Sequence, residues 1–173
     1  MATSLYDMSV ASYLQMLGGV SGFLEKGAQY AGESGLDLEE IVETRLRPDM
    51  LPFRFQVVSV AHHSLGAVKG MQAGLFQPPP SQPDLDYAGL QSLVSDAARE
   101  LEGFSREEID ALSGRGVLFK VSSMEIPFTA ENFVLSFSLP NFYFHATTAY
   151  DILRSKGVPL GKRDFLGAMK MGV

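Results

Sequence analysis

Apolar residues recur at intervals of three and four along four long stretches of this chain, and this spacing constrains the fold more than any other feature of the sequence. The first stretch runs from Ser4 to about Ala31, with apolar residues at Val10, Tyr13, Leu14, Leu17, Val20, Leu24, Ala28 and Ala31. Such spacing places one apolar stripe along an α-helix. Residues 50–73, 86–102 and 130–155 repeat the pattern. We therefore expect four long helices that share one core.

Glycine, proline and capping residues mark the ends of these helices. Gly35 ends the first helix, and Asp49 is expected to cap the second, with Pro52 in its first turn. The segment from Gly74 to Pro83 contains a run of three prolines and then a fourth, which excludes a helix there. A connection of this length can carry the chain across the end of a bundle instead of returning it in a tight hairpin.

The pattern changes between the third and fourth helices. Ser105 and Glu108 have the spacing of a capping box, which predicts a short helix after Ser105. Residues 117–121 are β-branched and aromatic, and residues 124–128 can pair with them as a hairpin. Thr129 is then placed to cap the fourth helix. The expected fold class is mainly α: a four-helix bundle with a small β-hairpin before the fourth helix, in one domain over residues 1–173.

Composition and charge exclude several classes of function. The 173 residues include no cysteine, which excludes a disulfide scaffold, a thiol nucleophile and a Cys-ligated zinc site. The net charge is −6 and no cluster of Lys and Arg exceeds a pair, so no nucleic-acid partner is expected. No apolar run approaches the roughly 18 to 20 residues of a membrane span, so no membrane partner is expected. Residues 1–4 show no secretion signal, and the expected location is the cytoplasm.

The three histidines limit any metal chemistry. His62 and His63 are neighbours on the second helix and point about 100° apart, so only one of them can face the interior. His145 lies on the fourth helix, and Asn141, four residues earlier, projects from the same face. One helix-two histidine with His145 and Asn141 could hold a divalent metal, zinc or nickel. Two imidazoles and a neutral amide are a poor cage, since a catalytic zinc normally has three protein ligands. The preferred interpretation is no cofactor, with His145 an interior, hydrogen-bonded histidine and the other two at the bundle edge.

Two further features mark the fourth helix. Pro140 lies inside it and is expected to kink it, freeing the carbonyl of Ser136 for another donor such as Ser138, water or a ligand. A simple kink that wraps the helix around the core is the alternative.

Aromatic residues also point all around this helix, and we expect some to leave the core as a dimer face or a pocket wall, unless the hairpin and the C-terminal tail cover them. They are Phe133, Phe137, Phe142, Tyr143, Phe144 and Tyr150.

Several stretches together resemble a known family. The most specific is the block Leu139-Pro-Asn-Phe-Tyr-Phe-His-Ala-Thr-Thr-Ala-Tyr150, followed by Gly157-Val-Pro-Leu-Gly161 and Asp164-Phe-Leu-Gly167. With Ser4-Leu-Tyr-Asp7 and Leu46-Arg-Pro-Asp-Met50, this resembles the domain-of-unknown-function family nineteen ninety-three. That family is placed in the DinB/YfiT-like superfamily of proposed metalloenzymes. The resemblance implies a four-helix bundle with an up-down-down-up arrangement that often dimerises.

The same resemblance bears on the site. In the superfamily, one metal-binding histidine comes from the second helix and two, four residues apart, come from the fourth, and some members transfer thiols. Here His62 or His63 can supply the first and His145 one of the others, while the remaining position is Asn141 or Ala149. The expected function is a small-ligand-binding or homodimeric module with a degenerate metal site. The alternative is a divalent-metal-dependent enzyme of thiol-transfer or hydrolysis type that uses His145 and a helix-two histidine.

Overall fold

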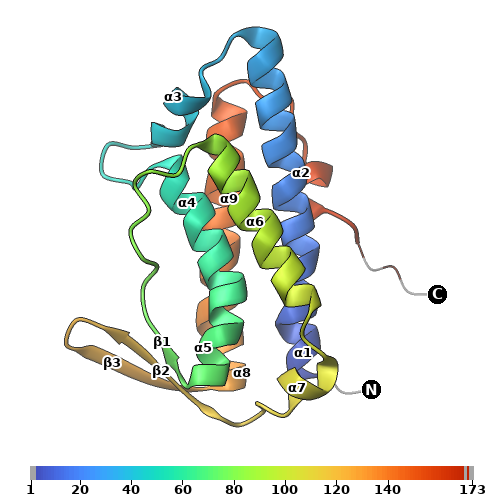
Figure 1. Ribbon diagram of the computed structural model, residues 1–173, viewed down its shortest axis with the longest axis vertical. Helices are drawn as coiled ribbons and strands as arrows, with labels where there is room; N and C mark the ends of the chain where they lie inside the picture. The colour runs from blue at the N-terminus through green and yellow to red at the C-terminus, as the bar shows by residue number, and fades with distance from the viewer. Residues whose placement is uncertain (1–2, 170, 172–173) are drawn as a thin grey trace.

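The computed structural model describes residues 3–169 and residue 171, and it is mainly helical with one small sheet (Figure 1). The α-helices are α1 (Leu5–Met8), α2 (Val10–Ser34), α3 (Leu38–Glu43), α4 (Phe53–Ala61), α5 (Ala67–Ala73), α6 (Tyr87–Glu102), α7 (Arg106–Asp110), α8 (Ala130–Phe133), α9 (Leu139–Ser155) and α10 (Lys162–Leu166). Two π-helical segments, η1 (His62–Gly66) and η2 (Val134–Ser138), join α4 to α5 and α8 to α9. The strands are β1 (Leu75–Phe76), β2 (Gly116–Val121) and β3 (Met124–Thr129).

Four long helical segments lie side by side: α2, α4–η1–α5, α6 and α8–η2–α9. Helix α4 packs against both α9 and α6, and α2 packs against both α6 and α9. Figure 1 shows α2 and α9 running in one direction and the other two segments in the opposite direction. The connection after β1 runs along the length of the molecule to reach α6, instead of crossing one end of the bundle as the proline-rich segment suggested.

Capping residues fix the helix ends largely where the sequence places them. Asp86 accepts a hydrogen bond from the amide of Gly89, and Ser105 forms its capping box with Glu108. The Thr129 side chain accepts from the amide of Asn132 at the start of α8. Each cap gives a partner to an amide that the first helical turn leaves without one.

Two predicted helix boundaries were wrong. The first helix is divided at Ser9, whose φ of −103° and ψ of −90° are not helical, and α2 then continues to Ser34. The N-cap of α4 is Pro52 and not Asp49. Proline at this position loses nothing, because its missing N–H would have no partner in the helix.

The expected hairpin is present, and a strand that the sequence did not suggest extends it. Strands β2 and β3 pair antiparallel, with Phe119 opposite Ile126. Strand β1 pairs with β2 in parallel, so the sheet order is β1-β2-β3. Gly74, at φ +73°, ends α5 and turns the chain into β1. The glycine is needed there because other residues rarely adopt this conformation.

The core fills the space between the four segments. Its largest fully buried side chains come from all of them, namely Tyr13, Phe23, Phe53, Tyr87, Phe133 and Phe142. In the described part of the chain, no helix combines the length and the apolar character needed to cross a membrane.

Candidate functional site

The two π-helical segments face each other, and buried hydroxyl groups join them. The Ser138 hydroxyl, at the end of η2, donates to the backbone carbonyl of His63 in η1 at 2.7 Å. The hydroxyl of Tyr13, from α2, lies 2.7 Å from Ser138 Oγ and donates to it, because the Ser138 proton is already used. A π turn disturbs the regular backbone ladder, and this chain supplies a donor to one carbonyl in the disturbed turn. The sequence had suggested Ser138 as a donor to Ser136, which was wrong.

His63 is the helix-two histidine that faces the interior. Its side chain is buried, with an exposed fraction of 6%, and its ring stacks on that of His145 with centroids 5.8 Å apart and an interplanar angle of 18°. Phe76 and Phe137 pack against the same ring. Within the described residues, neither His63 Nδ1 nor the nearby Ser59 Oγ has a hydrogen-bond partner. Burial, with the neighbouring histidines adding to it, lowers the pKa of His63 to about 3, so the imidazole is neutral at physiological pH.

His145 is oriented by a glutamine that the sequence analysis did not identify. His145 Nδ1 lies 2.8 Å from Gln56 Oε1, and since a carbonyl oxygen only accepts, Nδ1 carries the proton. The Gln56 amide donates in turn to the carbonyl of Leu51 at 2.8 Å, which fixes its orientation. The lone pair of the imidazole is therefore on Nε2. Burial lowers the pKa of His145 to about 4.

His62 does not join this pair. Its Nε2 lies 2.6 Å from the carbonyl oxygen of Gln77 and donates to it, and its ring packs on Phe76 with centroids 4.5 Å apart. The preferred interpretation, with both adjacent histidines at the bundle edge, was wrong for His63, which is buried. The prediction that only one of the two can face the interior is confirmed, because His62 turns toward the segment after β1. Burial lowers the pKa of His62 as well.

Asn141 lies one helical turn before His145, as the spacing predicted. Its Nδ2 donates to the carbonyl of Phe137 at 2.7 Å, inside η2. One N–H of this amide therefore supports the irregular helix turn before Pro140, and Oδ1 is the atom left that could bind a metal ion.

A spacing in the sequence could have identified the missed residues. Gln56, Ser59 and His63 are three and four residues apart, so they share the face of α4–η1 that packs toward α9. They are buried polar residues on an otherwise apolar stripe. Only the apolar members of that stripe and the histidines entered the prediction of the site.

The two alternatives for the aromatic residues of the fourth segment each hold for some of them: the hairpin and α10 cover Phe137 and Tyr150, whereas Phe144 is exposed. Phe128 from the hairpin and Phe119 from β2 pack against Phe137, and Phe165 of α10 packs against Tyr150. Phe144 is 59% exposed and packs by its edge against His145.

A divalent metal, which the family resemblance implies, was tested against these side chains. Two imidazoles, those of His63 and His145, lie close together. Residues 3–169 and 171 contain no group of three or more His, Cys, Asp or Glu side chains that could hold a metal ion. These residues therefore do not complete the three-ligand set of a catalytic zinc site.

Comparison with known proteins agrees with this fold. No curated protein matches the chain. A crystal structure of a DinB family member from Shewanella denitrificans, at 1.83 Å resolution, superimposes with a TM-score of 0.80. It is 26% identical, and the match covers 98% of this chain and 95% of that one. The model of a domain of unknown function, DUF1993, matches residues 5–166. Because this match spans nearly the whole sequence, the chain belongs to the DUF1993 family, and its fold is of the DinB type.

Proposed function

We propose that this chain is a DinB-like four-helix bundle that binds a neutral, polar small molecule at a degenerate metal site formed by His63 and His145. The observation that supports this proposal most directly is the pair of stacked imidazoles, in which Gln56 holds His145 in a fixed tautomer. Both rings stay neutral at physiological pH, because burial holds the pKa of His63 near 3 and that of His145 near 4.

The hydrogen-bonding groups of the site support a neutral ligand. His145 Nε2 offers a lone pair, while His63 Nδ1 and Ser59 Oγ are buried without partners among the described residues. A buried polar group without a hydrogen bond costs about 1 to 3 kcal/mol, so a ligand that satisfies such groups gains affinity. A charged ligand would lose its hydration and would find no opposite charge on these neutral side chains.

The second candidate is a divalent-metal-dependent enzyme of thiol-transfer or hydrolysis type. One observation favours it: the Gln56–His145 hydrogen bond resembles those that hold the rings of metal-binding histidines in a fixed orientation. His63, His145 and the Oδ1 atom of Asn141 would be the protein ligands.

Metal loading separates the two candidates. The purified protein is equilibrated with Zn²⁺ or Ni²⁺, desalted and analysed for bound metal, with a His145→Ala variant beside it. The ligand-binding proposal predicts no stoichiometric metal in either protein. One equivalent in the wild type that His145→Ala loses would overturn it in favour of the enzyme. His62→Ala is the matched control, because His62 Nε2 is already bonded to the carbonyl of Gln77.

The small-molecule proposal has its own readout. Neutral hydroxyl- and amide-bearing fragments are titrated while the imidazole nitrogens are followed by NMR. We expect His145 Nε2 to shift in a saturable way, with a smaller response in Gln56→Leu, because the tautomer is then no longer fixed. Fragments that leave the resonances of His63 and His145 unchanged would refute the proposal.

We also propose that two copies associate through the outer face of η2 and α9. Leu135 is 52%, Tyr143 39% and Phe144 59% exposed, which is high for large apolar side chains that lie on one structural segment.

A further inference from the structure

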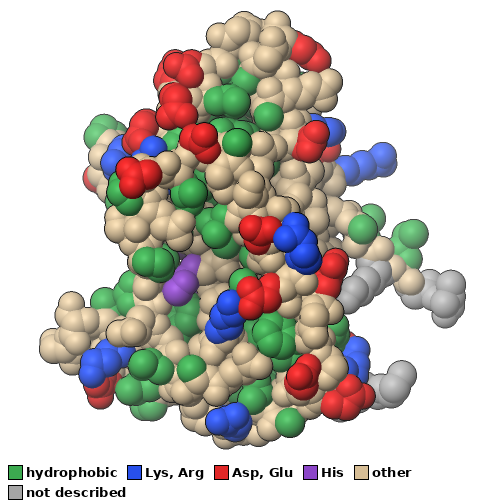
Figure 2. Space-filling view, viewed as in Figure 1, with side chains coloured by type: hydrophobic (Ala, Val, Ile, Leu, Met, Phe, Trp, Pro, Cys, Tyr) green, Lys and Arg blue, Asp and Glu red, His purple; other side chains and the backbone are tan. Residues whose placement is uncertain are grey.

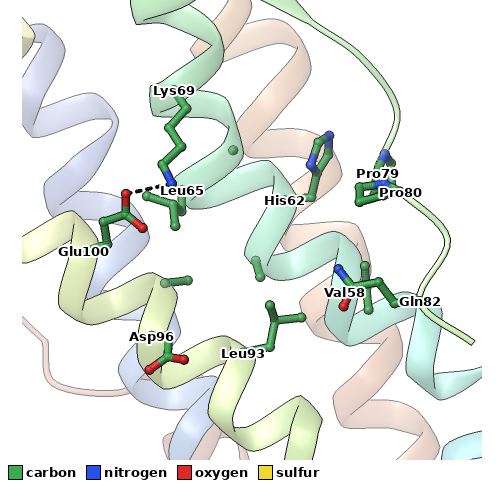
Figure 3. A pocket seen from close by; sticks show the side chains of 13 residues that line it. Val58, His62, Leu65, Lys69, Pro79, Pro80, Gln82, Leu93, Asp96 and Glu100 are labelled. Atoms are coloured by element: carbon green, nitrogen blue, oxygen red, sulfur yellow. Dashed lines mark ion pairs between the residues drawn. The ribbon is translucent and has the colours of Figure 1, made fainter. Parts of the chain in front are cut away.

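A cavity of about 350 Å³ is lined by His62 but by neither His63 nor His145, and we call it the strap groove (Figure 3). One wall is α4–η1–α5, a second is α6, and the third is the proline-rich strap formed by residues 77–83. Its apolar surface comes from Val58, Ala61, Leu65, Leu93, Ala97, Pro79 and Pro80. This volume lies within the range of small-molecule pockets, which are mainly apolar with a few polar groups.

His62 supplies the polar group at the strap side of the groove. Its Nε2 proton is donated to Gln77, so Nδ1 carries the lone pair. A Cβ atom on Gly66, which also lines the groove, would lie only 2.9 Å from Nδ1. The absence of that side chain leaves space beside this acceptor. Figure 2 shows a histidine at this face of the molecule among hydrophobic side chains.

The charged side chains of the groove are paired with one another or with neighbours. Lys69 and Glu100 form an ion pair at 2.7 Å across the end of the groove, and Asp96 pairs with Arg99 at 2.7 Å. A charged ligand would have to compete with these pairs and would lose hydration in an apolar pocket. The groove therefore favours a neutral molecule.

The strap favours a ligand molecule with a flat ring. The rings of Pro79 and Pro80 present aliphatic surface toward the groove, and proline rings pack well against aromatic faces. In the described chain, the backbone of residues 77–84 forms no hydrogen bond with other backbone groups outside the strand pairing. The strap is held by His62, which bonds the carbonyl of Gln77, and at its far end by Arg54, which donates to the carbonyl of Leu85. It can therefore shift to admit a ring without breaking a ladder of hydrogen bonds.

We propose that the strap groove is a binding site for a neutral aromatic molecule that carries an N–H or O–H donor. The ring packs between the strap prolines and Leu93 of α6, and its donor bonds His62 Nδ1.

Indole and 1-methylindole test this inference, because they share the ring system and differ in the N–H donor. Each is titrated into the full chain, and backbone amide shifts are followed by NMR. We expect saturable shifts centred on Leu65, Gly66 and Ala97, and a dissociation constant for 1-methylindole about three- to tenfold weaker, as expected for one lost hydrogen bond. Absence of saturable shifts, shifts centred on His145, or equal affinity for the two probes would each overturn the proposal.

Variants locate the site independently. Leu93→Trp fills the groove and should abolish indole binding, while Ser95→Trp, on the same helix but outside the groove, should leave it unchanged. His62→Phe keeps a ring against Phe76 but removes both the acceptor and the bond to Gln77, so indole should bind more weakly and no more tightly than 1-methylindole. Indole binding that survives Leu93→Trp, or that His62→Phe leaves unaltered, would overturn the assignment. The comparison of the two probes on the wild-type chain stands even if a variant fails to fold.

Discussion

At the scale of single residues, the histidines show how burial decides charge. All three have pKa values lowered by burial, most strongly His63, which lies between Phe76, Phe137 and the ring of His145. A neutral imidazole can pack in such surroundings, whereas an imidazolium would carry an unpaired charge into them. Protonation therefore opposes the folded state.

This burial predicts a pH dependence of stability. The folded pKa of His63 is about 3, against 6.5 for an unperturbed histidine, so between these values the unfolded chain binds the extra proton. The stability contributed by neutral His63 is fully present above pH 6.5 and is lost as pH falls below it, with a slope of about 1.4 kcal/mol per pH unit. Urea unfolding from pH 7 to 4.5 measures this slope. His63→Gln should lower it by about that amount, and an unchanged slope in the variant would contradict the burial argument.

At the scale of elements, the site depends on two irregular helix turns that meet. Segment η1 contains both His62 and His63, and η2 ends at Ser138, whose hydroxyl bonds the His63 carbonyl. Tyr13 adds α2 to the same chain of hydrogen bonds. Three elements are thus joined by one buried serine.

Substitution of Ser138 should lower the free energy of unfolding substantially. Ser138→Ala leaves the His63 carbonyl and the Tyr13 hydroxyl without their partner, and at about 1 to 3 kcal/mol for each buried group we expect a loss of about 2 to 6 kcal/mol. Tyr13→Phe keeps the Ser138–His63 bond and should cost about 1 kcal/mol. Chemical denaturation of both variants and of the double variant measures these values. The double variant has no hydroxyl at position 13 that could be left without a partner. The stability losses of the two single variants should therefore add up to more than the loss in the double variant. Strict additivity of the losses would show that no network exists.

The same elements show what the sequence could predict. Periodicity and caps located the long helices and the hairpin, because apolar stripes and residues such as Asp86 and Thr129 act locally. The π turns were not predicted, since one extra residue in a turn barely alters the apolar pattern, although Pro140 did indicate an irregularity in that helix. Strand β1 is two residues long and owes its conformation to pairing with β2, which no local pattern records. The choice between His62 and His63 depended on the helix rotation that the π turn sets.

At the scale of the whole molecule, two faces carry different candidate binding surfaces. The strap groove, with His62 and paired charges, opens between α6 and α4–η1–α5 (Figure 3). Charges of both signs are interspersed over the face that Figure 2 shows. Leu135 of η2 and Tyr143 and Phe144 of α9 are each more than a third exposed to solvent. A monomer gains nothing from exposing such side chains to water, which is the physical reason to expect a partner surface there.

Self-association through that face is measured by light scattering coupled to gel filtration. We expect the wild type to elute at about twice the 18.8 kDa mass of one chain. Phe144→Lys should give a monomer, because burying a lysine charge against an identical surface is unfavourable. Met124→Lys, at a hairpin position that is 49% exposed, adds the same charge elsewhere and should remain a dimer. Raising the salt concentration should strengthen the dimer, since it screens repulsion between two chains of net charge −6. A wild-type monomer at every concentration, or dissociation of both variants alike, would exclude this face as the interface.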